Sequence, residues 1–434
     1  MARTALEHAL PAGWVDEVFD EHRKRQYPRE LLFSTVVELM TLVSLGLRPS
    51  LHAAARKMEA LPVTLAALYD KVNRTEPAIL RALVRGSAER LAPVAAVVSG
   101  SAVLPGWRLR VLDGNHLPAS EKRLAPLREH RGAALPGQAL VVYDPDSGLV
   151  TDIVASEDAH QSERSSVAPL LDSAQPGQLW IADRHFCTRA ILPGWDAAGA
   201  CFTVREHARH PRLAGRGEWR GCGRTETGQV REQAIEVAGH PASWRRIELA
   251  LDTPTEAGEN TIRLWSNLPA DIGAQQVAKL YRTRWRIESM FQRLESVLHS
   301  EVRSLGHPRA ALLGFAVAVL AHNVLALLAR CVEQAHREQE PPEVSTYHLA
   351  LHIRSAYEGM LIALPPEQWR SYDGNPTALA ERLLQLARNI NPRQVATSKR
   401  GPKVAKLRGY VDGAVARAQV STARVLAQAR TATP

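Results

Sequence analysis

The first hundred residues carry apolar positions with the spacing of α-helices. Residues 30–47 form one long apolar segment, and residues 50–74 read as two helices separated by a break at Leu61-Pro62-Val63. Thr64 is placed to cap the second of these helices. Such a helix-turn-helix can put its second helix into the major groove of DNA, although many helical hairpins never contact DNA. The pattern predicts a helical domain over residues 1–100, with DNA binding as its candidate role.

From about residue 105 the period shortens to that of strands. The segment ALVVYDPDSGLVTDIVASED (139–158) reads as a hairpin whose turn is DPDSG. Further strands are predicted at 107–117, 178–186 and 201–207, with helices at 161–174 and 188–200. Strands that alternate with helices in this way predict an α/β domain. Its first part spans residues 101–207.

The next segment, residues 208–270, is predicted to be a β-rich insertion, because it contains alternating runs such as RRIELALD. Helical spacing resumes at 274–299, so the last part of the α/β domain is placed at 271–335. Residues 336–434 are expected to form a helical region followed by a basic tail.

One segment, ALLGFAVAVLAHNVLALLA (311–329), is apolar enough to raise the question of a membrane span. His322 and Asn323 lie near its middle, and the sequence has no second segment of this kind. Polar groups are costly at the centre of a bilayer. The segment is therefore predicted to be a buried core helix of a protein without membrane contact.

The formal net charge of +9 over 434 residues and a pI near 9.6 favour an anionic partner, most often nucleic acid. Residues 391–434 alone hold nine Lys or Arg and a single acid, Asp412. The run TSKRGPKVAKLRG (397–409) fits either a solvated tail or a DNA-binding tail.

The chain has four cysteines and no CxxC pair, which argues against a disulfide framework or a structural zinc site. Charged residues occupy the N-terminus where a signal peptide needs an apolar run. Both features predict a protein of the reducing cytoplasm.

Two aspartates follow apolar strands. Asp113 comes after RLRVL and before Gly114, and Asp183 comes after LWIA. Functional groups of α/β proteins often gather at the ends of neighbouring buried strands. An aspartate at a strand end also commonly does no more than begin a turn.

Glu288 lies within the predicted helix YRTRWRIESMFQRLES (281–296). At about 100° per residue, Tyr281, Arg284, Glu288 and Glu295 fall within about 60° of arc. The adjoining face is apolar and contains Ile287, Met290, Leu294 and Leu298. Glu288 therefore lies at the edge of the core-facing stripe, where it could also be an ordinary surface partner of Arg284.

Three convergent carboxylates suit phosphodiester chemistry. Two Mg²⁺ ions about 4 Å apart can stabilise the attacking and leaving oxygens, and Mg²⁺ prefers carboxylate ligands. No side-chain base is then required. Asp113, Asp183 and Glu288 are the candidate ligands.

The spacing Tyr281-x2-Arg284-x3-Glu288 resembles the YREK signature of bacterial insertion-sequence transposases, which are DDE enzymes of the insertion-sequence-four type. The DGNH turn at Asp113 and the ADRHF turn at Asp183 resemble the two aspartate motifs of that family. Residues 135–164 and 305–325 are also similar to members. The resemblance covers residues 15–430.

The resemblance implies a ribonuclease-H-like core with a β-rich insertion, and a site in which Asp113, Asp183 and Glu288 hold two Mg²⁺ ions, with Mn²⁺ able to substitute. It implies that Tyr281 and Arg284 contact DNA near the element end, with Arg184 as a further contact. The signature's final Lys falls on Glu295 here, and Arg293 is a candidate replacement. Trp244 and Trp265 are candidates for holding a flipped base, although a buried structural role suits either one.

The function implied is that of a DNA transposase that binds terminal inverted repeats, cleaves at the element ends and joins the 3′-hydroxyl to target DNA. It would work as a homodimer on DNA, in association with the bacterial nucleoid. Two alternatives stay open: a domesticated DNA-binding protein without catalysis, and a ribonuclease-H-like nuclease that never joins strands.

Overall fold

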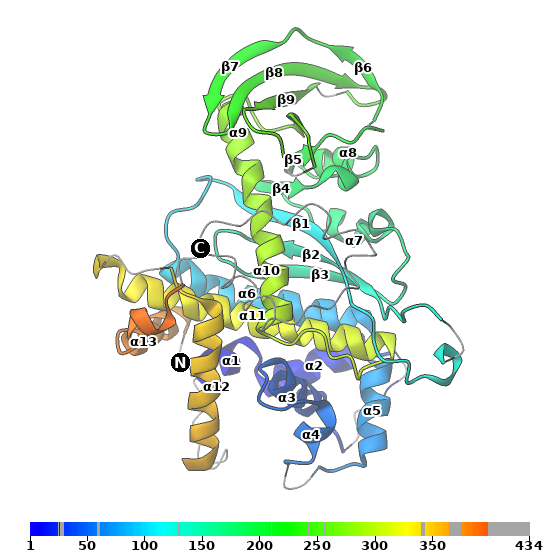
Figure 1. Ribbon diagram of the computed structural model, residues 1–434, viewed down its shortest axis with the longest axis vertical. Coiled ribbons are helices and arrows are strands. Elements are labelled where there is room, and N and C mark those ends of the chain that lie inside the picture. Colours follow the sequence, from blue (N-terminus) through cyan, green and yellow to red (C-terminus); the bar gives the residue numbers. More distant parts are fainter. Residues whose placement is uncertain are drawn as a thin grey trace, which may run out of the picture. The chain divides into compact units, whose positions relative to one another are not determined.

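The computed structural model describes ten stretches of the chain (Figure 1): residues 1–24, 26, 30–58, 61–128, 131–209, 211–241, 243–255, 257–339, 343–363 and 375–397. The basic C-terminal tail, for which the sequence left open either a solvated tail or a DNA-binding tail, lies almost wholly outside these described residues. Within them, Met1–Ala396 form one compact unit, so the N-terminal helices belong to the same unit as the sheet.

A ten-stranded mixed sheet runs through this unit in the order β3-β2-β1-β4-β5-β10-β9-β8-β6, with β7 paired to β8. Its strands are β1 (Arg108–His116), β2 (Gln138–Tyr143), β3 (Val150–Ser156), β4 (Gln178–Ala182), β5 (Cys201–Arg205), β6 (Leu213–Arg216), β7 (Arg220–Thr225), β8 (Gly228–Val237), β9 (Ser243–Leu251) and β10 (Thr261–Ser266). The α/β class predicted from the sequence is confirmed.

The strands β1, β4 and β5 are parallel neighbours, and β2 and β3 form an antiparallel hairpin beside β1. This hairpin is the one predicted over residues 139–158. The β-rich nature of residues 208–268 is confirmed as well. These strands extend the same sheet, because β10 pairs with β5.

The described helices are α1 (Ala2–Ala9), α2 (Ala12–His22), α3 (Phe33–Ser44), α4 (Leu51–Ala55), α5 (Leu65–Arg74), α6 (Pro77–Val98), α7 (Ala168–Leu171), α8 (Ile191–Ala197), α9 (Ala274–Tyr281), α10 (Trp285–Ser296), α11 (Pro308–Ala335), α12 (Thr346–Ala363) and α13 (Pro376–Ala387). Two helices, α4 and α5, lie where the helix-turn-helix was predicted, but α4 is only five residues long and ends at Ala55, so residues 56–64 separate the helices and not a short break at Leu61-Pro62-Val63. Thr64 caps α5 as expected, since its Oγ1 accepts a hydrogen bond from the Ala67 backbone N–H at 3.2 Å.

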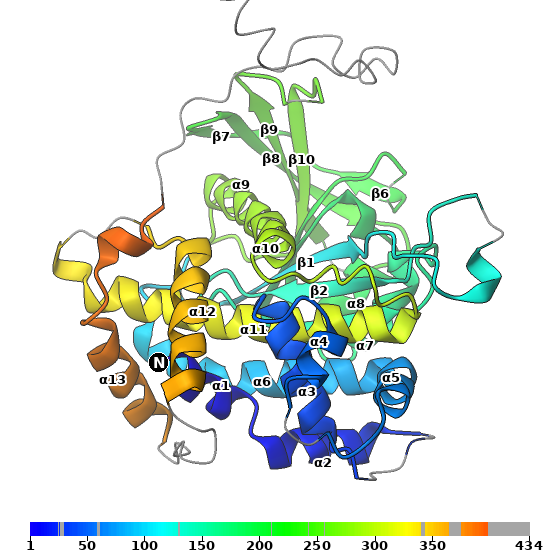
Figure 2. The ribbon, with the colours of Figure 1, turned by 60° about the horizontal axis from the view of Figure 1, so that its bottom comes forward.

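The long apolar helix α11 packs against α6 (Figure 2), and α6 in turn packs against strand β3. α11 is long and apolar enough to cross a membrane, yet 94% of its most apolar window is buried inside the protein. Its two polar residues are bound to the β3 region. Asn323 accepts from the Val150 N–H at 2.7 Å and donates to the Val150 carbonyl at 2.9 Å, and His322 lies 3.1 Å from the Gly148 carbonyl. The prediction of a core helix is confirmed.

The opposite face of the sheet is covered by a separate apolar cluster that includes α8 and residues of α7. Stacked and edge-on aromatic rings fill it, among them Trp180, Trp195, Phe202, Trp244 and Trp265. The sheet therefore has two covered faces, and side chains at successive strand positions enter one or the other.

Candidate active site

Strand register brings the two predicted aspartates side by side. β1 and β4 pair in parallel with Leu112 opposite Ala182, so Asp113 and Asp183 are the next residues on the two strands. Leu112 and Ala182 both belong to the aromatic cluster. Because successive side chains alternate, the carboxylates point to the other face, where α10 packs against β1.

Asp183 is held by the turn that follows β4. It stands at the N-terminus of a 3₁₀ turn, Arg184–Phe186, where its Oδ1 accepts a hydrogen bond from the His185 backbone N–H at 2.8 Å. Asp113 is held in a similar way, since its Oδ1 accepts from the Gly114 N–H at 3.0 Å. The turn-forming role expected for an isolated aspartate is therefore real, and it leaves one oxygen of each carboxylate free of that bond.

Glu288 is linked to Asp113 through Arg284. The Arg284 Nη1 lies 3.1 Å from Asp113 Oδ2, and its Nη2 lies 2.7 Å from Glu288 Oε1. The Arg284 side chain is only 12% exposed. The i,i+4 pair is thus present, but it is part of a half-buried bridge between β1 and α10 and is no simple surface pair.

The charge around Asp113 is unusual. The pKa of this carboxyl group is raised to about 6. Burial is the largest cause, the Arg284 cation opposes it, and the negative charges of Asp183 and Glu288 add to the increase. Since both acids act on Asp113, the three predicted carboxylates share one electrostatic site.

Tyr281, the last residue of α9, lies beside the acids of the site. It is 8% exposed, and burial raises the pKa of its hydroxyl to about 12. The charges that act on that hydroxyl are those of Arg284, Arg205 and Asp183. Tyr281 and Arg284 therefore lie where the signature spacing predicted, next to the acids.

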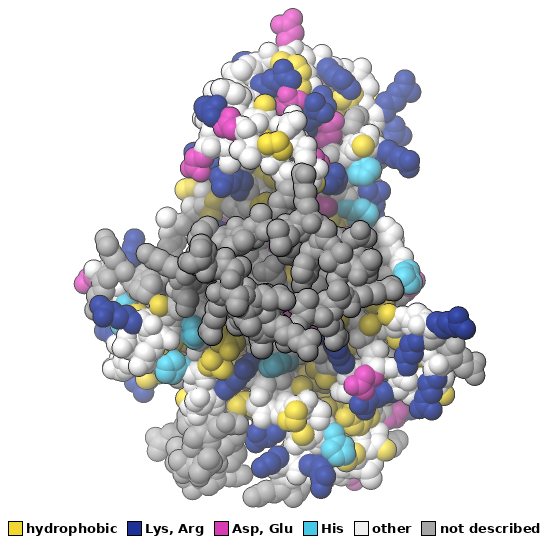
Figure 3. Space-filling model, in the orientation of Figure 1, with side chains coloured by type: hydrophobic (Ala, Val, Ile, Leu, Met, Phe, Trp, Pro, Cys, Tyr) yellow, Lys and Arg dark blue, Asp and Glu magenta, His cyan; other side chains and the backbone are white. Residues whose placement is uncertain are grey.

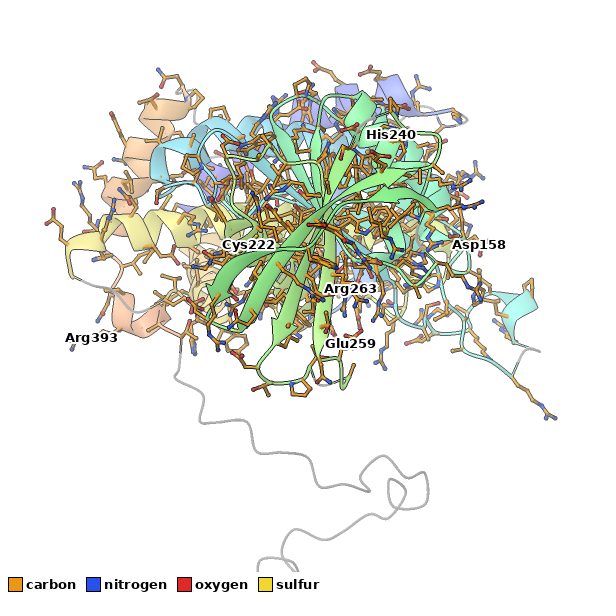
Figure 4. All side chains as sticks on the ribbon, turned by 90° about the horizontal axis from the view of Figure 1, so that it is seen from above. Asp158, Cys222, His240, Glu259, Arg263 and Arg393 are labelled. Atoms are coloured by element: carbon orange, nitrogen blue, oxygen red, sulfur yellow. The ribbon has the colours of Figure 1, made fainter. Side chains whose placement is uncertain are left out.

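Arg184 lies at the rim of the site and is paired with Glu259. Its side chain is 52% exposed, and its Nη1 lies 3.5 Å from Glu259 Oε1. The other oxygen of Glu259 binds Arg205 at 2.5 Å. Glu259, labelled in Figure 4, comes from the turn between β9 and β10. Arg205 was missed by sequence reasoning, although its place at the end of a predicted strand could have marked it.

Arg293 lies away from these acids. It is half-buried on α10, and its charge acts on Tyr143 and His322, two buried groups whose pKa values are governed first by burial. Burial lowers the pKa of His322 to about 3. Glu295, the residue at the expected Lys position, is exposed on α10 near Glu301.

The aromatic residues at this edge differ from those suggested by the sequence. Trp244 and Trp265 are buried to 1% and 0% exposure, so they are structural side chains of the aromatic cluster. Trp285 is 60% exposed instead, with the Arg284 guanidinium 5.0 Å from its ring centroid. Its position between Arg284 and Glu288 in the sequence was the available signal.

The donor set suits a hard divalent cation, since it consists of carboxylate oxygens whose mutual repulsion such an ion would relieve. Among the described residues, however, no group of three or more His, Cys, Asp or Glu side chains is gathered closely enough to hold a metal ion. Arg284 supplies the positive charge between Asp113 and Glu288 instead.

The chain is similar in sequence to known transposases. The model of the transposase DDE domain matches residues 108–324, which include all three acids. The transposase of insertion sequence element IS421 from Escherichia coli is 28% identical over 320 residues, which are 62% of this chain and 80% of that protein. The putative transposase InsL of element IS186A, from Escherichia coli strain K12, is 28% identical over 293 residues, or 57% and 74% of the two chains.

Proposed function

Because the chain belongs to the DDE transposase family, we propose that it is an insertion-sequence transposase that cleaves DNA at element ends and joins the 3′-hydroxyl to target DNA. The observation that carries the proposal is the convergence of Asp113, Asp183 and Glu288. The two aspartates directly follow the parallel-paired residues of β1 and β4, and Arg284 joins Asp113 to Glu288 on helix α10 through its two Nη atoms. The family members named above are transposases of insertion sequences, which is why transposition is favoured among DNA-cleaving reactions.

We propose that the core is ribonuclease-H-like. The order β3-β2-β1-β4-β5, with a hairpin antiparallel to a parallel centre, supports this fold. The strands β6–β10 would be the insertion between the second aspartate and the glutamate. This assignment also agrees with the signature of the insertion-sequence-four type, which contributes Tyr281, Arg284 and Glu288.

Asp113, Asp183 and Glu288 would hold two Mg²⁺ ions, with Mn²⁺ able to substitute. Such ions supply charge stabilisation for the attacking and leaving oxygens of phosphoryl transfer. Arg284 spans two of these carboxylates, so it has to release at least one before both can serve as ligands. The freed guanidinium is well suited to a DNA phosphate, because it offers paired donors in a fixed plane.

The DNA would lie along this edge. Tyr281 and Arg284 are the proposed contacts at the element end, with Arg184 and Arg205 at the rim and the exposed face of Trp285 available to a base. Arg293 stays a weaker candidate because its charge faces buried groups. Lys and Arg side chains also project from the β-rich end of the unit (Figure 3).

We propose α4 and α5 as the helices that recognise the terminal inverted repeats. We also propose that the protein acts as a homodimer in the cytoplasm, associated with the nucleoid.

The Asp183→Asn variant tests the proposal. It removes one ligand charge while keeping the size of the side chain, so strand cleavage in Mg²⁺ should fall by several orders of magnitude and binding to the ends should persist. Cleavage is measured on a labelled element end, and binding on the same DNA without divalent ions. Asp172→Asn, on an exposed residue outside the site, is the matched control and should cleave normally.

Three outcomes would contradict the proposal. Normal cleavage by Asp183→Asn would remove the metal-site assignment. A wild-type protein that binds the ends and never nicks DNA would be a domesticated DNA-binding protein. A wild-type protein that nicks DNA but never joins pre-cut ends to a target would be a nuclease.

A further inference from the structure

We infer that Glu163 and Arg164 are positioning residues that fix the two aspartate turns relative to one another, an inference that rests on the proposed function. Both residues belong to a short 3₁₀ turn, Glu163–Ser166, between β3 and α7. Glu163 comes 50 residues after Asp113 and Arg164 comes 19 residues before Asp183, and neither was a candidate from the sequence pattern. Their contacts reach both strand ends.

Arg164 hydrogen-bonds to the turn that carries Asp183. Its Nε donates to the His185 backbone carbonyl at 2.5 Å, and its Nη2 lies 3.5 Å from His185 Nδ1. The backbone N–H of this same His185 donates to Asp183 Oδ1. Arg164 therefore holds the peptide segment whose N–H orients the Asp183 carboxylate.

Glu163 lies against the turn that carries Asp113. A Cβ atom built on Gly114 would be 2.0 Å from Glu163 Oε1 and 2.4 Å from its Cδ, so the carboxylate occupies the space that any side chain at this position would need. The Gly114 N–H donates to Asp113 Oδ1. Only glycine at position 114 allows this approach.

The same carboxylate also faces the second turn. Glu163 Oε1 lies 3.9 Å from His116 Nδ1 and its Oε2 lies 4.0 Å from His185 Nε2, so it is placed between the imidazoles that follow the two aspartates. The Glu163 side chain is 20% exposed, which limits screening by solvent. Gly114 and Asp113 alternate along β1, so Glu163 contacts the strand from the face opposite to the Asp113 carboxylate.

Glu163 and Arg164 thus contact the two aspartate turns and not the aspartate carboxylates. Residues that orient metal ligands commonly change metal affinity by about 10- to 100-fold when mutated. Glu163 and Arg164 would act in this way, by setting the separation of Asp113 and Asp183 without touching the reacting atoms.

The test compares Glu163→Ala with Glu157→Gln, a control whose carboxylate pairs with Arg309 on another part of the surface. Glu163→Ala should raise the Mg²⁺ concentration for half-maximal cleavage by about tenfold or more. It should also reduce the rise in melting temperature that Mn²⁺ produces in the DNA-free protein, a readout that needs no activity. Binding to the ends without divalent ions should stay unchanged.

Gly114→Ala provides the second arm. In the wild-type background the added methyl group should displace Glu163 and raise the Mg²⁺ requirement. In the Glu163→Ala background the space is free, so the same change should add little, and this non-additivity reports the contact itself. Arg164→Lys should fall between wild type and Arg164→Ala, since it keeps the charge and loses the fork of donors.

Several results would overturn the inference. They are an unchanged Mg²⁺ midpoint and Mn²⁺ shift in Glu163→Ala, strictly additive effects of the two changes, or a loss at saturating Mg²⁺ as large as that of Asp183→Asn, which would make Glu163 a ligand. If wild type cleaves and Asp183→Asn does not, any of these results removes the positioning role and leaves the proposed function intact.

Discussion

Asp113 combines burial with three neighbouring charges. Its pKa of about 6 lies above the ordinary value of 3.8 because burial disfavours the charged form, and Arg284 offsets only part of this cost. Without a divalent cation, the folded protein therefore keeps a proton on Asp113 over a pH range where the unfolded chain has already released it.

The stability of the folded state should respond to this proton. The Asp113 contribution is fully present below about pH 4 and is lost as the pH rises through about 6. Asp113→Asn removes the titration, so its stability relative to wild type should increase by about 2 kcal/mol between pH 4 and pH 6.5. Urea unfolding in metal-free buffer across this range measures the difference. A pH-independent difference would show that burial does not raise this pKa.

Some individual residues could not be assigned from the sequence. The spacing Tyr281, Arg284, Glu288 predicted a shared face, and the structure places those side chains together. Arg205 and Glu163 gave no comparable signal, because their roles depend on strand pairing and on the space above Gly114. Helical spacing reports only neighbours along one element, whereas contacts between elements depend on tertiary structure.

At the scale of elements, the segment 274–299 was predicted as one helix and is found as α9, a 3₁₀ turn at Arg282–Arg284, and α10. The tighter turn falls at Arg284, the residue that bridges Asp113 and Glu288. An α-helix and a 3₁₀ helix place side chains at similar angles over three residues, so the hydrophobic spacing does not distinguish them.

Helix α10 also carries the departure from the expected signature. Glu295 is exposed seven residues after Glu288, where the family resemblance implies a Lys. Glu295→Lys should therefore tighten binding to element ends several-fold and steepen the dependence of log K on log salt by about one unit, the effect of one added phosphate contact. Fluorescence anisotropy at several salt concentrations gives both quantities.

The control for this change is Glu89→Lys, on the exposed face of α6, where the Glu89 side chain is 71% exposed. It makes the same change of charge away from the site. An equal gain in both variants would mean that net charge is responsible and that position 295 has no special place on the DNA.

At the scale of the whole molecule, the order of elements and the α/β class were predictable because hydrophobic spacing is local. The joining of β10 to β5, which makes one sheet of the core and the β-rich segment, was not, because it is a pairing between residues about 60 apart in the sequence. The burial of α11 was predictable because His322 and Asn323 are too polar for the centre of a bilayer. In the structure these two side chains hydrogen-bond to backbone groups of Gly148 and Val150.

The basic C-terminal segment holds most of the net positive charge of the chain. Deleting residues 397–434 removes most of the chain's excess of Lys and Arg. If this segment contacts phosphate, the deletion should flatten the salt dependence of DNA binding. Binding isotherms of the full chain and the truncated chain, recorded from low to high salt, provide the comparison. An equal dependence of binding on salt in the two chains would show that the segment does not contact phosphate.

The bridge made by Arg284 has a thermodynamic consequence. As long as its guanidinium spans Asp113 and Glu288, it competes with any cation for the same oxygens. A phosphate that draws Arg284 away would leave those oxygens free, so DNA and the divalent ion should bind cooperatively. Linkage makes the effect reciprocal: by whatever factor the ion strengthens DNA binding, DNA strengthens ion binding. The protein without DNA would then bind the ion more weakly than the DNA complex does, which would favour the chemistry at the moment when an element end is in place.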